Sequence, residues 1–254
     1  MQTAIIYEHP LNELMRLSLR LEFLFDKIDQ HIGMNNTWQI RILMESLIHI
    51  AHLLERPDLK TKYAKTLQSQ IASLNLLRDQ NSIDQEKLKR LIDRLQKLFD
   101  HFNQTHGKIG QALRENQFIA SLHQHLLYPG GEAYFELPQY TAWLNQPKDV
   151  IEQQIRAWLS AFDHTRAVTK LLLKLTRHRG ALKEVTANDG YHQEDLDSKS
   201  NIQLIRIKLD ADKPYYPLVS ASKHRLNIRF NRSAVLDHED PVNEMITFGL
   251  ECCQ

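Results

Sequence analysis

Two apolar stripes separated by a line of cations are the first pattern in the chain. If residues 11–28 form a helix turning about 100° per residue, one broad face carries Leu11, Leu14, Leu17, Leu21, Leu24, Phe25 and Ile28. A second stripe carries Met15, Leu19 and Phe23, and the cations Arg16, Arg20 and Lys27 lie between the two. Pro10 is expected to begin this helix. We expect one stripe to pack inside its own domain and the other against a second layer, such as a partner subunit. The cations then lie at the rim of a groove.

Helical spacing of apolar residues continues well beyond this first segment. It predicts helices over residues 37–55 and 59–74, which Pro57 separates because proline fits only the first turn of a helix. Ser82 and Gln85 are a candidate capping box for a further helix, whose apolar residues recur at coiled-coil-like spacing. We expect the last two of these helices to form an antiparallel hairpin.

Prolines mark the starts of the last two expected helices. Pro138 is expected to begin a short helix that ends near Asn145, and Pro147 a longer one that reaches about Arg177. The helical period stops at Gly180, and the next twenty residues are polar and rich in turn-forming types.

Alternation with a period of two replaces the helical period in the last part of the chain. It predicts strands over residues 202–209 and 223–230, in which Leu226, Ile228 and Phe230 point inward, and a last strand over 245–250. Residues 1–7 read as one more strand. The expected fold class is therefore α+β. A mainly α-helical domain would span residues 11–180, and residues 1–10 with 181–254 would form a smaller antiparallel β domain.

Composition limits the classes of function. The chain has 254 residues with a net charge of +1 and 42% hydrophobic residues, which is ordinary for a globular protein and disfavours a general nucleic-acid coat. No apolar run is long enough to span a bilayer, and the N-terminus does not resemble a signal peptide, so we expect a cytosolic protein without membrane insertion. The adjacent Cys252 and Cys253 suit neither a disulfide scaffold nor a zinc site, and we expect reduced thiols.

The sequence contains none of the usual motifs of catalytic residues. The glycine-rich phosphate loops, the zinc-protease motif and the nucleophile elbow do not occur. His49 and His52 have the spacing of one helical face, but no acidic or cysteine partner recurs with them as in known metal motifs. We therefore expect no enzyme activity, no metal and no cofactor.

Several short stretches of the sequence match one known protein family. They include "MQT" at the start, "EHPLNE" from residue 8 and "LRE" from residue 113. "PGG", "FELP", "WL", "YP", "IRF" and the terminal "CC" follow in the family's order and at nearly its spacing. The matches extend over essentially the whole chain. By them the chain resembles the ZapD family, cytoplasmic bacterial cell-division proteins that associate with FtsZ.

The resemblance implies a dimeric, non-enzymatic protein that binds the C-terminal tail of FtsZ. By presenting two such sites it would crosslink and bundle FtsZ filaments and stabilise the division ring at mid-cell. The positions that match the family's basic contact residues are Arg16, Arg20, Arg56, Arg114, Lys223, Arg225 and Arg229. Gln117 and Thr141 depart from the family, because relatives are expected to carry basic or imidazole side chains there.

Plainer readings of these cations stay open. Arg16 can form a structural ion pair with Glu13, and Arg20 with Glu22 or with a neighbouring helix. The cations of residues 223–230 can equally belong to a solvated sheet face. A different class of function is a nucleic-acid-binding or regulatory module whose basic groove contacts phosphates, and it would show a steep salt dependence of binding.

Overall fold

The computed structural model describes residues 4–33, 36–78, 83–197, 200–222, 224–232 and 240–254. They form nine helices and two antiparallel sheets, so the expected α+β class is confirmed. The chain divides into two compact units, which we call the helical unit (residues 19–170) and the β unit (residues 1–18 and 171–254). Helices α1 (Glu13–His31) and α9 (Asp163–His178) contribute residues to both units. The expected domain boundaries at residues 10 and 180 stay a prediction.

The helical unit contains seven further helices between α1 and α9. They are α2 (Thr37–Leu53), α3 (Leu59–Asn75), α4 (Gln85–Gln104), α5 (Gln111–Arg114), α6 (Gln117–Leu126), α7 (Pro138–Leu144) and α8 (Lys148–Ser160). Three of them begin at a side-chain cap, in which Asn36, Asp84 or Asn116 accepts a hydrogen bond from a backbone N–H of the first turn. The expected capping residue Ser82 lies outside the described residues, and α4 begins after Asp84 instead.

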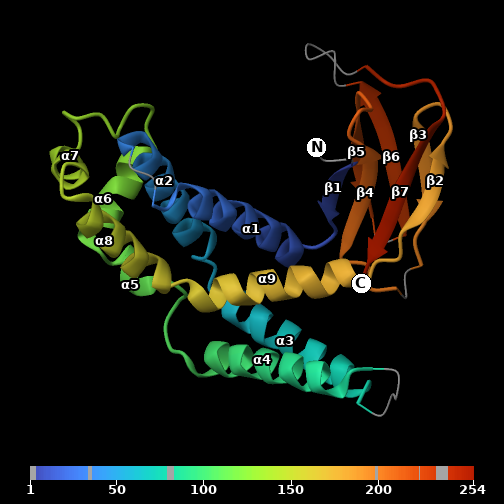
Figure 1. The fold of residues 1–254 in the computed structure, drawn as a ribbon, viewed down its shortest axis with the longest axis horizontal. Helices are drawn as coiled ribbons and strands as arrows, with labels where there is room; N and C mark the ends of the chain where they lie inside the picture. Colours follow the sequence, from blue (N-terminus) through green and yellow to red (C-terminus); the bar gives the residue numbers. More distant parts are fainter. Residues whose placement is uncertain (1–3, 34–35, 79–82, 198–199, 223, 233–239) are drawn as a thin grey trace. The chain divides into compact units, whose positions relative to one another are not determined.

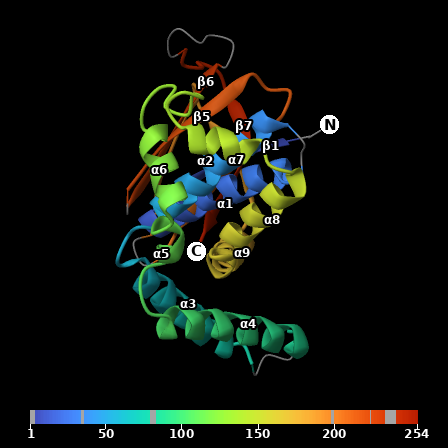
Figure 2. The ribbon, with the colours of Figure 1, turned by 90° about the vertical axis from the view of Figure 1, so that its left-hand side faces the viewer.

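Helices α3 and α4 form the expected antiparallel hairpin, and both ribbon views show them side by side (Figures 1 and 2). Each helix buries one apolar stripe. The buried apolar residues are Leu59, Tyr63, Leu67 and Leu74 on α3 and Leu88, Ile92, Leu95, Leu98 and Phe102 on α4. The rings of Tyr63 and Phe102 meet with their centroids 5.2 Å apart. The stripe read from the sequence is thus the surface that joins the two helices.

Two expected helix boundaries are wrong. The single helix expected from Pro147 to Arg177 is divided, because α8 ends at Ser160 and α9 begins at Asp163. Between them Phe162 is fully buried, and its ring lies so close to Gly110 that a side chain at that glycine would collide with it. At the other end of the chain Pro10 ends a strand, and the side chain of Asn12 caps α1 by accepting a hydrogen bond from the Met15 N–H.

Two sheets form the β unit. Strands β1 (Ala4–Pro10), β4 (Leu204–Asp210), β7 (Ile246–Cys253) and β2 (Lys183–Ala187) make the first, in that order. Strands β3 (Tyr191–Asp195), β6 (Arg225–Arg232) and β5 (Tyr215–Ala221) make the second. The buried core takes Ile205, Ile207, Phe248 and Leu250 from the first sheet and Leu226, Ile228 and Phe230 from the second. The inward alternation expected for residues 226–230 is confirmed.

Three strands were not expected from the sequence. Strands β2 and β3 lie in the polar segment after Gly180, and β5 contains Pro217. All three are edge strands in their sheets, so one side of each makes no hydrogen bonds within the sheet. Polar residues and proline are typical of such edges because they discourage pairing with other chains. Because of this composition, the three strands lack the regular alternation of apolar and polar residues that predicts a strand.

Candidate binding groove

A groove of about 500 Å³ lies between α1 and α2 in the helical unit. Leu19, Arg20, Phe23 and Leu24 line it from α1, and His49, His52 and Leu53 line it from α2. We call it the α1–α2 groove. Residues three and four positions apart share a helix face, and for this reason each helix presents a compact set of side chains to the groove.

The floor of the groove is apolar. Leu24 is buried, Leu19 and Leu53 are half-buried, and Phe23 is 68% exposed. Of the second stripe expected on α1, Met15 packs in the protein interior while Phe23 meets solvent. A large aromatic side chain kept in water beside other apolar residues is a feature of interaction sites.

Arg20 is the cation at the edge of this floor. It is exposed, and it makes no hydrogen bond or ion pair with another residue in the described part of the chain. Its neighbours in the line of cations differ, because Arg16 lies 3.3 Å from the Glu13 carboxylate and Lys27 lies 3.8 Å from that of Glu45. The structural ion-pair reading therefore fits Arg16 and does not fit Arg20.

His52 also borders a second, smaller hollow of about 140 Å³ in the helical unit. Its ring centroid lies 5.6 Å from that of His123, and its Nδ1 lies 3.5 Å from a carboxylate oxygen of Glu55. Arg114 lines the same hollow from α5. Two of the cations expected from the sequence, Arg20 and Arg114, thus border neighbouring hollows that share His52.

Arg114 is held in place more firmly than Arg20. Its Nη1 donates hydrogen bonds to the carbonyl oxygens of Ile109 at 2.7 Å and of Ala51 at 3.4 Å, which ties α5 to α2. Its other terminal nitrogen is buried without a hydrogen-bond partner in the described residues. An unsatisfied buried donor is uncommon in proteins.

The remaining expected cations lie elsewhere. Arg56 is exposed in the turn after α2 and has interactions of its own. In the β unit, Arg225 lies 3.5 Å from the Asp195 carboxylate, and the Arg229 guanidinium lies 5.9 Å from the centroid of the Tyr191 ring. Arg16 also belongs to this unit, and Lys223 lies outside the described residues.

The two positions that are expected to depart from the family lie on α6 and α7. Gln117 is exposed in the first turn of α6, and the Thr141 hydroxyl donates a long hydrogen bond of 3.5 Å to the Leu137 carbonyl oxygen within α7. Neither side chain carries a charge, and neither lines the α1–α2 groove.

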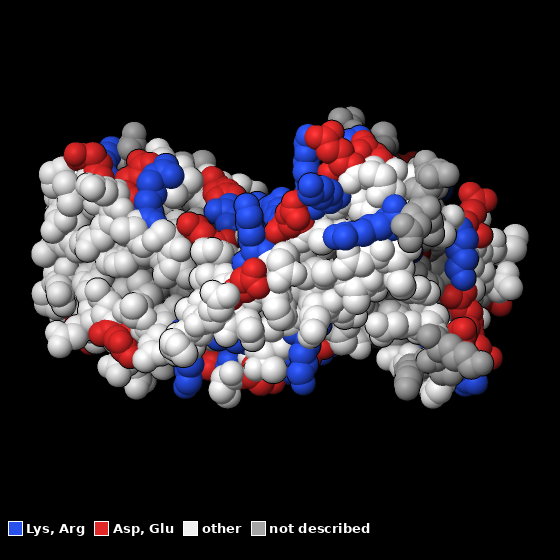
Figure 3. Space-filling model, turned by 90° about the horizontal axis from the view of Figure 1, so that it is seen from below, with Lys and Arg blue, Asp and Glu red and all other residues white. Residues whose placement is uncertain are grey.

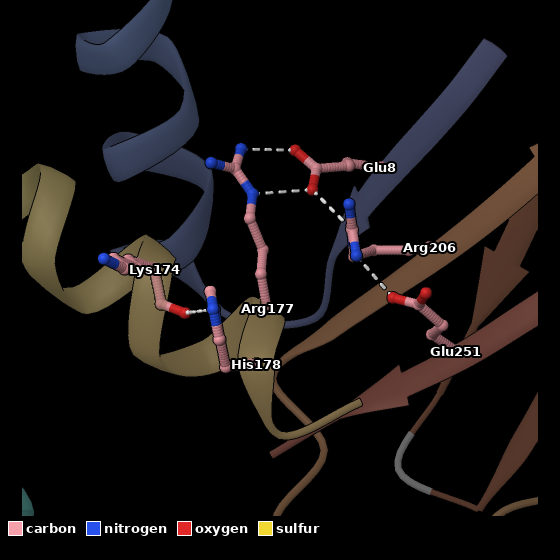
Figure 4. Close-up of polar contacts among 6 residues, drawn as sticks. All are labelled: Glu8, Lys174, Arg177, His178, Arg206 and Glu251. Carbon is pink, nitrogen blue, oxygen red and sulfur yellow. Dashed lines mark hydrogen bonds and ion pairs between the residues drawn. The ribbon is translucent and has the colours of Figure 1, made fainter. Parts of the chain in front are cut away.

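The β unit contains a denser cluster of charges, which differs in kind from the groove. Glu8 of β1 accepts hydrogen bonds from Arg177 of α9 at 2.6 and 2.8 Å and from Arg206 of β4 at 2.9 Å (Figure 4). Arg206 also donates to Glu251 of β7. The four side chains are half-buried and each has an opposite charge beside it, so this cluster is a structural network.

A hollow of about 740 Å³ in the β unit also carries charges of both signs. Lys208 and Lys213 line it together with Glu184, Asp210 and Glu244. The Tyr215 hydroxyl donates a 2.5 Å hydrogen bond to Glu244, which raises the pKa of the tyrosine. Figure 3 also shows charges of both signs close together, because most Lys and Arg side chains on the face that it draws have Asp or Glu close by.

The described residues contain no group of three or more His, Cys, Asp and Glu side chains placed to hold a metal ion. None of the described helices is both long and apolar enough to cross a bilayer.

The floor of the α1–α2 groove was not expected from the sequence as a binding surface. The sequence pattern places Phe23 in an apolar stripe that packs against a second layer, and it indicates His49 with His52 only as a possible metal pair. The one available signal was the position of Arg20 next to an apolar stripe.

The family model and the similar proteins all indicate the same family. A family model described as "ZapD: Cell division protein" matches residues 19–229. The chain is 36% identical over 254 residues to a protein of Coxiella burnetii named "Cell division protein ZapD", covering 99% of this chain and 98% of the relative. Proteins with the same name from Cupriavidus pinatubonensis and Methylococcus capsulatus are 35% and 32% identical, over 98% and 100% of this chain and 99% of each relative.

Proposed function

This chain belongs to the ZapD family of cell division proteins, and from this premise we propose that it binds the C-terminal tail of FtsZ. As a homodimer with two tail sites it crosslinks and bundles FtsZ filaments and so stabilises the division ring. The protein acts in the cytoplasm at mid-cell, without catalysis and without a cofactor.

The observation that carries the proposal is Arg20 at the edge of an apolar groove, because this cation has no ion-pair partner among the described residues. A cation without an acidic neighbour is free to receive a carboxylate from another molecule. The apolar floor beside it lowers the local dielectric constant, which strengthens such a contact relative to one in open water. Arg114 supports the proposal because it offers a second cation in the neighbouring hollow.

The other expected cations complete the proposed contact surface as weaker contributors. Arg16, Arg56, Arg225 and Arg229 are exposed, and Arg16, Arg56 and Arg225 already interact with other groups of the chain. Lys223 is included from the family resemblance alone. Exposed charges of this kind mainly raise the rate of association, since they attract an acidic segment from a distance.

Dimerisation is required for bundling because one tail site can hold only one filament. A short flexible tail loses conformational entropy when it binds, so a single site is expected to bind weakly. Two sites on one dimer raise the overall affinity for a filament that carries many tails.

Sedimentation of FtsZ polymers tests the proposal directly. The protein should sediment with polymers of full-length FtsZ, and removal of the tail should abolish both co-sedimentation and bundling. Light scattering should give about twice the 29.8 kDa mass of the monomer. Equal bundling of tail-truncated FtsZ would refute tail binding, and a monomeric mass with intact bundling would refute the dimer. A salt-sensitive shift of DNA or RNA without FtsZ binding would favour the phosphate-binding alternative.

A further inference from the structure

We infer that the α1–α2 groove recognises a pair of side chains, a bulky apolar residue seated against Phe23 and a neighbouring carboxylate held by Arg20. The inference rests on the proposed function, since the ligand is taken to be the FtsZ tail. It adds to that function the chemistry of the recognised segment and assigns Phe23 as the residue that provides the apolar contact.

The apolar half of the inference follows from the lining of the groove. Leu19, Phe23, Leu24 and Leu53 surround its floor, and the charged or imidazole groups Arg20, His49 and His52 belong to the same lining. Phe23 is 68% exposed, although burial of a phenylalanine side chain is favourable. A ligand that contributed only charge would leave this surface in water.

The charged half follows from the pairing of the cations on α1. The carboxylates of Glu13 and Glu45 lie beside Arg16 and Lys27, while Arg20 has no such partner in the described residues. A tail carboxylate is therefore the complementary group at this position.

The spacing of the two residues defines the recognised segment. Arg20 and Phe23 are three positions apart on one helix, which places their Cβ atoms about 5–6 Å from each other. In an extended peptide, neighbouring residues are about 3.3 Å apart along the chain. The carboxylate and the apolar side chain should thus be separated by one or two positions in an extended tail. The groove volume of about 500 Å³ lies within the usual range for a site that takes a small molecule or a few side chains.

The histidines of α2 limit the opposite side of the groove. His49 and His52 are exposed imidazoles on the face of α2 that lines it, and both can donate hydrogen bonds to main-chain carbonyl groups. Such contacts tolerate different side chains, which leaves the selection of sequence to Phe23 and Arg20.

Fluorescence anisotropy with a labelled synthetic peptide of the FtsZ C-terminal tail tests the inference on the full-length protein. Phe23→Ser should weaken binding about tenfold or more, because it removes the apolar contact. Phe23→Leu should retain most of the affinity, since the side chain stays apolar. Phe135→Ser is the matched control, because Phe135 is 80% exposed in the helical unit and does not line the groove; it should bind like the unchanged protein.

Changes in the peptide provide the reciprocal measurement. Replacing the tail's bulky apolar residues by serine, one at a time, should identify one position whose loss weakens binding by the unchanged protein but adds little to the loss in Phe23→Ser. Replacing an acidic residue one or two positions away by its amide should weaken binding by the unchanged protein. The same replacement should add little to the loss of binding in Arg20→Gln.

The possible results separate the inference from the proposed function. If Phe23→Ser binds the peptide as well as the unchanged protein while Arg20→Gln does not, the apolar seat is refuted and tail binding stands. If the unchanged protein neither binds the peptide nor sediments with FtsZ polymers, the proposed function itself is refuted. Thermal unfolding of each variant should coincide with that of the unchanged protein, because Phe23 contributes little to the packed interior.

Discussion

Two arginines of the β unit and one of the helical unit are placed in opposite ways. Arg177 and Arg206 of the β unit are half-buried and hydrogen-bonded to Glu8, and Arg206 also to Glu251. Arg20 of the helical unit is exposed beside an apolar floor and has no partner in the described residues. In the first arrangement the charges are paired within the fold. In the second the charge of Arg20 is available to a ligand. Whether a cation can serve recognition is thus decided by its neighbours, which a count of basic residues does not reveal.

Sheet register explains the charge network of the β unit. Glu8, Arg206 and Glu251 occupy directly opposite positions on β1, β4 and β7, so that charges of alternating sign form a row across three strands. Opposite charges in facing positions stabilise a strand pair. Arg177 of α9 then adds a two-point contact to the carboxylate at the end of the row (Figure 4).

Removal of the carboxylate that Arg177 and Arg206 share should have the largest effect. Glu8→Ala leaves two half-buried arginines without their shared partner, and we expect a loss of about 3 kcal/mol in the free energy of unfolding. Thermal or urea unfolding measures it, while the affinity of the folded protein for the FtsZ tail should be nearly unchanged. Glu86→Ala is the matched control, because the Glu86–Arg90 pair on α4 is exposed, and it should cost less than about 0.5 kcal/mol. Equal losses in the two variants would contradict the distinction.

Reversal of the charge at Arg20 should produce the opposite pattern. Arg20→Asp removes an attractive charge and adds a repulsive one, so we expect tail binding to weaken by about 2 kcal/mol, roughly thirtyfold. Bundling should fall further, since the loss occurs at both sites of the proposed dimer. The unfolding curve should stay in place, because Arg20 makes no ion pair within the described chain.

The matched control for Arg20 is Arg94→Asp, at an exposed position on α4 that is not part of the groove. It should bundle FtsZ normally. A folded Arg20→Asp protein with unchanged bundling would return Arg20 to an ordinary surface role.

A pH effect of smaller size is expected at the stacked rings of His101 and His164, whose centroids are 3.5 Å apart. Burial lowers the pKa of His101, and the nearby His164 and Lys60 lower it further. The folded state therefore binds fewer protons than the unfolded state when the pH falls below about 6.5, and stability decreases from there toward the lowered pKa. His101→Gln should reduce the difference in melting temperature between pH 7.5 and 5.5. An identical difference in both proteins would show that another group titrates.

The smallest effect is expected at Arg16, which resembles Arg177 in being paired and Arg20 in being exposed. The side chains of Arg16 and Glu13 are 45% and 44% exposed, and pairs of this kind contribute about 0–1 kcal/mol to stability. Arg16→Gln should therefore shift the free energy of unfolding by less than about 0.5 kcal/mol, as measured by urea unfolding. A larger loss would place Arg16 among the structural cations.

Local patterns in the sequence were sufficient for much of the fold. Helical spacing predicted α2, α3, α4 and the packing stripe of α1, and alternation predicted β4 and β6, because each of these elements buries one face. The position of Arg20 between two apolar stripes also followed from helical geometry alone. The edge strands β2, β3 and β5 did not follow, since their polar composition serves to prevent pairing.

Tertiary structure alone decided which charges are paired and which surfaces are open. Glu8 and Arg177 are 169 positions apart in the chain, and only the folded β unit brings them within hydrogen-bond distance. The break before α9 depends on the burial of Phe162 against Gly110, and the α1–α2 groove exists only where Phe23 of one helix faces His52 and Leu53 of another. Periodicity reports which face of an element is apolar, because that is a property of neighbouring residues. What covers that face, or leaves it open for a partner, depends on contacts between residues far apart in the sequence.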